Sequence, residues 1–242
     1  MAEDPVRSLS PDGRVIMITG ASRGIGRAIA GRLQDDGYRL SIGVRRPADV
    51  KGFDAERVLV HPFDATKPDT TEPWLAATIE RFGRLDGLIN NAGILRALDL
   101  RSGDESVLDE MWAVNVKAPF RLIRLALPHL EKTGHGRIIN VASTDGKRYR
   151  EGVSVAYTMT KHAVMALSHA AKFAGWEHGV RVTALCPGTV DTELVASVPG
   201  VVASANRIAP ETVADTVSFL LSLPNNASVA ELVMNTRLES WI

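Results

Sequence analysis

The sequence predicts an α/β protein with a doubly wound, mostly parallel sheet of about seven strands, covered by helices on both faces in three layers, as in the Rossmann fold. Short apolar runs rich in β-branched residues alternate with longer stretches of helical periodicity along the chain. A glycine-rich turn follows the first apolar run. Alternating strands and helices favour parallel pairing, and 242 residues suit one domain, 1–242, with a large core.

The first strand is expected at 14–19 and the first helix at 24–36, where Gly37 supplies a helix stop. The later strands are expected at 39–44, 57–61, 85–90, 137–142, 180–185 and 229–234. The later helices are expected at 71–82, 104–131 with a bend near Pro119, 155–176 and 210–221. The stretch 189–209 follows a strand end, where ligands bind in open α/β sheets, so we expect a substrate-binding loop or lid there.

The composition argues against several classes of protein. Lys+Arg and Asp+Glu each number 28, so the net charge is zero and the basic footprint of a nucleic-acid binder is missing. No apolar run approaches the roughly 18 residues that cross a bilayer, and the first 14 residues do not resemble a secretory signal. The single cysteine, Cys186, permits no intrachain disulfide, which fits a cytoplasmic protein. The six histidines lack ligand spacing and predict no metal site.

The glycine-rich turn runs from Thr19 to Gly26 with the sequence TGASRGIG. Glycines allow positive φ and let the backbone approach a ligand closely. The N-terminus of the helix that follows directs N–H groups and partial positive charge toward a phosphate. A tight turn without a ligand would show the same glycines, but the position directly after the first strand favours a dinucleotide site.

This turn resembles that of the short-chain dehydrogenases/reductases, and four further motifs in the family's order and spacing support the resemblance. They are the sequence NNAG at 90–93, Ser143 after the fifth strand, YTMTK at 157–161, and Pro187-Gly188 after the sixth strand with Val190 and Thr192 beyond. Together the motifs cover residues 14–235. The resemblance implies an oxidoreductase that moves a hydride between a nicotinamide cofactor and a carbonyl/alcohol pair, with a small-molecule substrate and no nucleic-acid or membrane partner.

Tyr157 and Lys161 are four residues apart and share one helix face. A nearby ammonium favours the phenolate and lowers the pKa of a tyrosine from about 10, so the pair predicts a general acid/base. By resemblance, Ser143 donates a hydrogen bond to the substrate oxygen and Lys161 also binds the nicotinamide ribose. Asn115 matches the family's asparagine that supports a proton relay through water; an asparagine that packs at a helix kink is the alternative.

The second strand predicts NADP(H) as the preferred cofactor. It ends in Arg45-Arg46, and no acidic residue follows until Asp49, whereas NAD-preferring relatives place a carboxylate there. The planar forks of Arg45 and Arg46, with Arg23 from the turn, suit a 2′-phosphate, unless the strand-end arginines point to solvent. Asp64 resembles the aspartate that contacts adenine, with a plain turn aspartate as the alternative. By resemblance, the other cofactor contacts fall on Gly20, Ser22, Gly24, Ile25, Gly26, Ala65, Asn91, Ala92, Gly93, Tyr157, Lys161, Pro187, Gly188, Val190 and Thr192.

Two other functions compete with this interpretation. One is a catalytically silent nucleotide-binding sensor, but such relatives usually lose the tyrosine or the lysine, and both are present here. The other is a sugar-nucleotide epimerase or dehydratase, which resembles longer chains than one with about 50 residues after Pro187. The sequence does not identify the substrate: Lys147, Arg148 and Arg150 either bind an acidic substrate group or belong to a solvated loop.

Relatives commonly form dimers or tetramers, so we expect a homodimer or homotetramer with two-fold symmetry. Two helix faces are the candidate contacts, unless they simply cover the sheet. They carry Ala163, Ala166, Ala170, Ala171 and Ala174 on the long helix, and Leu122, Leu125, Ala126 and Leu130 on the helix before it.

Overall fold

Seven parallel strands form one sheet in the computed structural model, which describes residues 7–101, 103–150, 152–196 and 204–236. The strand order is β3-β2-β1-β4-β5-β6-β7. The predicted doubly wound, Rossmann-like architecture is confirmed. The strands are β1 (Val15–Thr19), β2 (Arg39–Val44), β3 (Val58–Pro62), β4 (Gly87–Asn90), β5 (Arg137–Val141), β6 (Arg181–Pro187) and β7 (Glu231–Met234).

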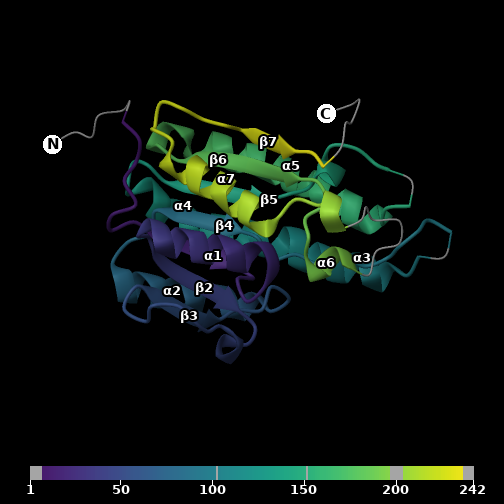
Figure 1. The fold of residues 1–242 in the computed structure, drawn as a ribbon, viewed down its shortest axis with the longest axis horizontal. Coiled ribbons are helices and arrows are strands. Elements are labelled where there is room, and N and C mark those ends of the chain that lie inside the picture. Colours follow the sequence, from purple (N-terminus) through teal and green to yellow (C-terminus); the bar gives the residue numbers. More distant parts are fainter. Residues whose placement is uncertain (1–6, 102, 151, 197–203, 237–242) are drawn as a thin grey trace.

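Helices cover both faces of the sheet (Figure 1). Helices α1 (Gly24–Asp36) and α7 (Pro210–Ser222) pack beside each other on one face. Helices α2 (Thr71–Phe82), α4 (Ala118–Glu131) and α5 (Val155–Gly175) cover the other face. Helix α3 (Glu105–Trp112), the short α6 (Glu193–Ala196) and single-turn helices at Pro47–Asp49, Pro68–Thr70, Thr144–Gly146 (η4), Trp176–His178 and Ser204–Asn206 complete the described structure.

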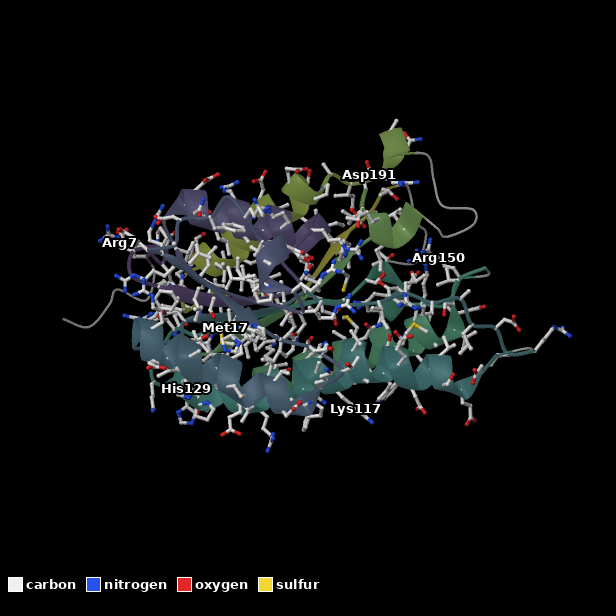
Figure 2. All side chains as sticks on the ribbon, turned by 90° about the horizontal axis from the view of Figure 1, so that it is seen from below. Arg7, Met17, Lys117, His129, Arg150 and Asp191 are labelled. Carbon is white, nitrogen blue, oxygen red and sulfur yellow. The ribbon has the colours of Figure 1, made fainter. Side chains whose placement is uncertain are left out.

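The core lies on both sides of the sheet because successive strand residues point to opposite faces. In β1, Ile16 and Ile18 join the cluster beneath α1 and α7, whereas Met17 joins the cluster beneath α2 and α4. Figure 2 shows Met17 in the interior of the molecule. Strands buried on both faces explain the continuous apolar runs in the sequence.

The expected helix at 104–131 is interrupted. Helix α3 ends at Trp112, a π-helical turn (η3) spans Ala113–Lys117, and α4 then begins at Ala118. The irregularity precedes Pro119, which occupies the first turn of α4, so the bend expected near this proline is displaced toward the N-terminus. A π turn holds one more residue than an ordinary helical turn, and such turns often occur at functional sites. The other element boundaries agree with the prediction, as for α1, β2 and α2, or shift by one or two residues.

The chain adds β2 and β3 on one side of β1, and then adds β4 to β7 on the other side. Such a change of direction places a crevice at the carboxyl ends of β1 and β4. Gly20 follows β1, Asn91 follows β4 and Ser143 lies two residues beyond β5. The topology therefore brings three separate sequence motifs to one edge of the sheet. In the described part of the chain, no helix is both long and apolar enough to span a membrane.

Candidate active site

The glycine-rich turn packs tightly against the segment that follows β4. Gly20 has a φ of 71°, and a Cβ there would lie 3.0 Å from the Cα of Ala92. A Cβ on Gly26 would lie 2.4 Å from Nδ2 of Asn91 and 2.5 Å from the carbonyl oxygen of Gly20. Nδ2 of Asn91 donates to the carbonyl oxygens of Thr19 and Gly20 at 2.9 and 3.2 Å. Asn91 thus holds the turn in the shape that only glycines permit.

The N-terminus of α1 fits the phosphates of a dinucleotide. Arg23 is its N-cap residue, and its side chain makes no capping hydrogen bond in the structure. The first-turn N–H groups of this 13-residue helix therefore suit an anion. Gly24 has a φ of 54°, and a Cβ there would lie 3.3 Å from Cγ2 of Thr192. Thr192, expected from the sequence, thus lies beside the turn.

The three arginines expected to bind a 2′-phosphate are exposed to solvent, and two of them form ion pairs with acidic residues. Arg46 donates through Nε to Asp49 at 2.6 Å, and Arg23 forms an ion pair with Glu193. Arg45 is exposed at the end of β2. The alternative that the strand-end arginines point to solvent describes their present orientation, since 81% of the Arg46 side chain is accessible.

Asp64 follows β3 and shapes a turn. Its Oδ1 accepts hydrogen bonds from the backbone N and the hydroxyl of Thr66, at 3.0 and 2.8 Å. Burial raises the pKa of Asp64, but the two hydrogen bonds from Thr66 and the charges of Lys67 and Arg45 outweigh it, so the pKa is lowered. The turn role is therefore real, and it leaves Oδ2 outside these two bonds. Ala65 beside it is buried.

Ser143 and Tyr157 come together at the carboxyl end of β5. Burial raises the pKa of Tyr157 above its ordinary range and Asp145 raises it further, against a hydrogen bond with Ser143 and the charge of Arg150. The net direction is thus opposite to the lowering expected from the lysine four residues away. The cost of burying a phenolate outweighs the charge of Arg150.

Lys161 lies one helical turn beyond Tyr157, with its ammonium directed to the backbone of β5. Nζ donates to the carbonyl oxygen of Val141 at 2.8 Å and lies 5.5 Å from the centroid of the Tyr157 ring. Burial lowers the pKa of Lys161 to about 8, against the charges of Cys186 and Asp145. The cation is thus retained near neutral pH, in a position fixed by the sheet.

Asn115 occupies the π turn and joins three elements. Its Oδ1 accepts from the backbone N of Ile94 at 2.9 Å, and its Nδ2 donates to the carbonyl oxygen of Ile94 at 2.9 Å and to the hydroxyl of Thr160 at 3.1 Å. A Cβ on Gly93 would lie 3.4 Å from Oδ1 of Asn115 and 3.8 Å from Nζ of Lys161. Packing at a helix irregularity is therefore observed, and it places Asn115 close to the lysine.

The segment after β6 begins the same crevice. Pro187 ends β6, and the N–H of Gly188 donates to the carbonyl oxygen of Met234 at 2.7 Å. Val190 is buried and pairs with Ile208 in an isolated bridge. Both ends of the expected 189–209 loop are thus anchored; residues 197–203 of it lie outside the described structure.

Ion pairs engage Lys147 and Arg150 in the loop after Ser143. Lys147 pairs with Glu231 of β7, and Arg150 donates to Asp145. The sequence analysis does not name Asp145 as a site residue, because in the sequence it only begins a basic loop. Its position two residues after Ser143 was the signal available. Figure 2 shows Arg150 and Asp191 at the end of the molecule opposite to Arg7.

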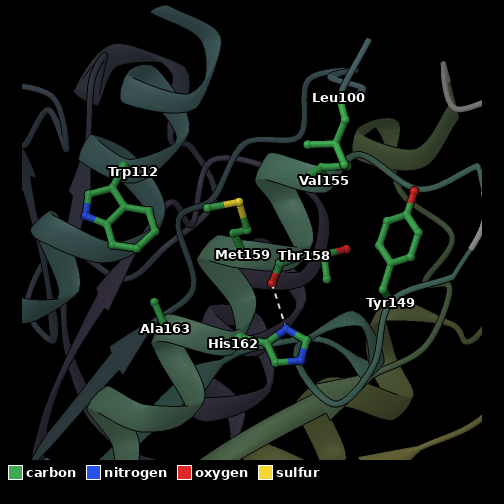
Figure 3. Close-up of a pocket in the computed structure, with 8 residues that line it drawn as sticks. All are labelled: Leu100, Trp112, Tyr149, Val155, Thr158, Met159, His162 and Ala163. Atoms are coloured by element: carbon green, nitrogen blue, oxygen red, sulfur yellow. Dashed lines mark hydrogen bonds between the residues drawn. The ribbon is translucent and has the colours of Figure 1, made fainter. Parts of the chain in front are cut away.

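A separate apolar pocket of about 620 Å³ lies on the outer side of α5 (Figure 3). Its α5 residues are on a different face of the helix from Tyr157 and Lys161. The pocket is lined by Leu100, Trp112, Tyr149, Val155, Thr158, Met159, His162 and Ala163. Among the side chains that the structure describes, no three His, Cys, Asp or Glu residues gather as metal ligands.

Comparisons with known proteins agree with this geometry. The family model for short chain dehydrogenase matches residues 14–200. The chain is 41% identical over 219 residues to an agropine synthesis reductase of Rhizobium rhizogenes, which aligns over 89% of this chain and 50% of that protein. The chain thus spans about half the length of this relative. It is 36% identical over 190 residues to a D-beta-hydroxybutyrate dehydrogenase of Rhizobium meliloti (strain 1021), over 75% of this chain and 73% of that protein.

Solved structures show the same fold. An alcohol dehydrogenase from the archaeon Thermococcus sibiricus, complexed with 5-hydroxy-NADP, matches with a TM-score of 0.85 and 32% identity over 93% of this chain and 99% of that one. A 3-ketoacyl-(acyl-carrier-protein) reductase from Brucella melitensis, complexed with NADH, matches with a TM-score of 0.84 and 26% identity over 93% and 97%. The chain belongs to the short-chain dehydrogenase family of oxidoreductases.

Proposed function

We propose that this protein reduces a carbonyl group on a small molecule with NADPH, using Tyr157 as the general acid. One observation carries the proposal: Ser143, Tyr157 and Lys161 gather at the carboxyl end of the sheet, in the crevice that the uncapped N-terminus of α1 also reaches. In open α/β sheets this crevice is where ligands bind.

The residues divide the work in the following way. When bound, NADPH supplies the hydride that the carbonyl carbon receives. Tyr157 and Ser143 direct hydroxyl groups at the substrate oxygen, so they stabilise negative charge where it develops. Tyr157 then gives its proton to that oxygen. Its raised pKa keeps the phenol protonated at neutral pH, as a proton donor must be.

Lys161 and Asn115 support the reacting groups. The Lys161 ammonium would bind the nicotinamide ribose while the carbonyl oxygen of Val141 holds its position. Asn115 keeps the π turn in place and lies beside this lysine, where water carrying protons to Tyr157 would pass. Gly93, between the two side chains, leaves room for the ribose.

The preference for NADPH rests on charge at the end of β2. Arg45, Arg46 and Arg23 would offer guanidinium groups to a 2′-phosphate once Arg46 and Arg23 leave Asp49 and Glu193, and Asp49 is the first carboxylate after the strand. A similar solved structure carries an NADP analogue and another carries NADH, so relatives of this fold use either cofactor. Guanidinium forks match phosphate geometry and favour the phosphorylated form.

Assembly into a homodimer or homotetramer is part of the proposal. Of the residues expected at the interface, Leu122, Ala126, Leu130 and Ala171 are buried in the chain's own core, so these four cover the sheet instead. The outer faces of α4 and α5 still expose apolar side chains, namely Phe120, Met159, Ala166, Ala170, Phe173 and Ala174. A second copy seated on this face would remove them from water.

Replacing Tyr157 by Phe tests the catalytic assignment. The ring packing is retained and the proton donor is lost, so we expect turnover of a verified ketone to fall by about two orders of magnitude or more. NADPH binding, followed by cofactor fluorescence, should survive. Near-normal turnover in this variant would show that another group donates the proton.

A further inference from the structure

Asp145 is a buried carboxylate fixed between Ser143 and helix α5. The residue is 6% exposed and lies in the single helical turn η4. Its backbone N–H donates to Oγ of Ser143 at 3.1 Å. The next residue, Gly146, packs so closely on α5 that a Cβ there would lie 2.8 Å from the carbonyl oxygen of Lys161. The position of Asp145 is therefore set by the same groups that set the catalytic residues.

The carboxylate acts on both reactive side chains. After the larger effect of burial, Asp145 raises the pKa of Tyr157. Burial lowers the pKa of Lys161, and Asp145 opposes that effect. Asp145 bonds through its backbone to Oγ of Ser143, which in turn bonds to Tyr157, so the residue lies close to the two hydroxyls that would meet the substrate carbonyl.

Arg150 uses only part of the hydrogen-bonding capacity of Asp145. Its Nε and Nη2 both donate to Oδ1, at 2.8 and 2.6 Å. No residue that the structure describes donates to Oδ2. Because an ionised carboxylate offers about four acceptor positions, Asp145 can accept a further hydrogen bond from a ligand.

The same arrangement disfavours an anionic substrate group at this place. Arg150 is committed to Asp145, and Lys147 is committed to Glu231 on β7. A carboxylate on the substrate would meet the carboxylate of Asp145, and the two like charges would repel each other. The acid-binding interpretation of these two cations therefore loses its basis.

We propose that Asp145 determines substrate specificity by accepting a hydrogen bond from a hydroxyl or ammonium group on the carbon next to the reacting carbonyl. The substrates are then hydroxy ketones or amino ketones, rather than simple ketones or keto acids. The proposal rests on the reductase function proposed above. A site that bonds to a polar substrate group rejects the analogue without it, because its own polar group is left unpaired.

Four small ketones test the assignment with the full-length protein and NADPH. Hydroxyacetone and 2-butanone have the same number of heavy atoms, aminoacetone carries the ammonium group, and pyruvate carries a carboxylate. The readout is the ratio of kcat/KM for hydroxyacetone to that for 2-butanone in each variant, which cancels their intrinsic difference in reactivity. We expect Asp145→Leu to lower this ratio at least about tenfold, the loss typical of a hydrogen bond to a charged group.

Two further variants separate recognition from packing. Asp145→Asn is isosteric and keeps one acceptor. It should therefore lower the ratio of kcat/KM for aminoacetone to that for 2-butanone more than it lowers the ratio for hydroxyacetone to 2-butanone. This variant also tests the proposal if Asp145→Leu does not fold. Arg150→Gln breaks the same ion pair but leaves the carboxylate, so the ratio should stay within about threefold of wild type. Asp35→Asn, on the exposed side of α1, is the matched surface control.

The outcomes are distinct. Equal changes in Asp145→Leu and Arg150→Gln would mean that the ion pair only holds the loop, and the proposal would be overturned. An unchanged ratio in Asp145→Leu, or a wild-type protein that prefers pyruvate, would overturn it as well. If kcat/KM for 2-butanone and for hydroxyacetone fell equally in every Asp145 variant, the specificity role would be overturned while the reductase function would still be supported. A wild-type protein that binds NADPH but reduces none of the four ketones would contradict both.

Discussion

Glu193, the first residue of helix α6, forms an ion pair with Arg23 in the glycine-rich turn. About two thirds of each side chain is accessible, at 67% and 68%. The pair ties the start of the 189–209 segment to the turn that would hold the cofactor phosphates. It also occupies one of the three arginines that the proposed NADPH preference requires.

We therefore expect Glu193→Gln to tighten NADPH binding. Arg23 would be released toward the 2′-phosphate, and an exposed ion pair of this kind is worth up to about fivefold in affinity. Asp49→Asn releases Arg46 in the same way and shows which arginine matters more. Titration with both cofactors is the measurement; an equal gain for NADH and NADPH would exclude a role of Arg23 at the 2′-phosphate.

Arg45→Asp should weaken NADPH binding by about tenfold or more while NADH binding changes little. The substitution removes a charged hydrogen bond and adds a carboxylate that repels phosphate. Lys51→Asp, an exposed change of the same charge beyond the end of β2, controls for the general change in surface charge. Equal wild-type affinities for NADPH and NADH would refute the preference.

Two glycines in helix α1 should respond in opposite directions to alanine. Gly26→Ala would place a methyl group 2.4 Å from Asn91 and 2.5 Å from the carbonyl oxygen of Gly20, so cofactor binding and stability should both be lost. A Cβ on Gly31 meets nothing within 4 Å, so Gly31→Ala should stabilise the protein by about 0.5–1 kcal/mol. Thermal unfolding with and without NADPH measures both effects. A tolerant Gly26→Ala would argue against the tight turn.

The pH dependence of cofactor use should report Lys161. Burial lowers the pKa of Lys161 to about 8, so its ammonium is lost as the pH rises through that value. We expect kcat/KM for NADPH, which reflects the free enzyme, to decline above about pH 8. Asp145→Asn removes a charge that raises this pKa, so the decline should begin at lower pH. An inflection that does not move in this variant would assign the titration to another group.

Acid should destabilise the protein by protonating Asp86, a buried residue that accepts hydrogen bonds from Val15 of β1 and from Arg84. Burial opposes ionisation, but hydrogen bonds from His135, Arg84 and the backbone N of Val15 lower the pKa of Asp86 from 3.8 to about 2. A carboxylate with a lowered pKa stabilises the fold at pH values above its pKa in the unfolded chain. This stabilisation is lost as the pH falls through its pKa in the folded protein. About 2 kcal/mol should therefore disappear between pH 4 and pH 2.

Urea unfolding of wild type and Asp86→Asn tests this assignment. The variant should be less stable at pH 7, and the gap should narrow toward pH 2. A gap that stays constant with pH would show that packing, and not the charge of Asp86, is responsible. Asp35→Asn provides the exposed comparison.

Elements with strong local signals could be predicted from the sequence. The sequence predicts helix α1 at its observed bounds because a glycine turn precedes it and Gly37 follows it, and in the structure Gly37 adopts the left-handed conformation that ends the helix. The π turn at Ala113–Lys117 could not be foreseen, because it depends on bonds that the amide of Asn115 makes to Ile94 and Thr160, distant in sequence. Periodicity describes a helix and not the contacts that interrupt it.

The site divides in the same way. Tyr157, Ser143 and Lys161 follow from motifs, and the structure brings them together. The raised pKa of Tyr157 could not be predicted from the lysine four residues away, because burial of the whole group decides its sign. The partners of Arg23 and Lys147 are Glu193 and Glu231, separated by 170 and 84 residues, and only the fold shows that these arginine and lysine side chains are engaged.

The strand order also places the shortest strand pairing of the sheet, between β1 and β4, beneath the proposed cofactor site. Residues 14–62 form β1, β2 and β3, residues 87–234 form the other four strands, and the two halves meet in the sheet only along β1 and β4. Three residue pairs make that seam, compared with five between β1 and β2. Gly20 follows β1 and Asn91 follows β4, so a dinucleotide that contacted both residues would hold the two halves of the sheet together. Its binding energy would oppose partial opening along the seam, and amide exchange there would slow as the cofactor concentration rises.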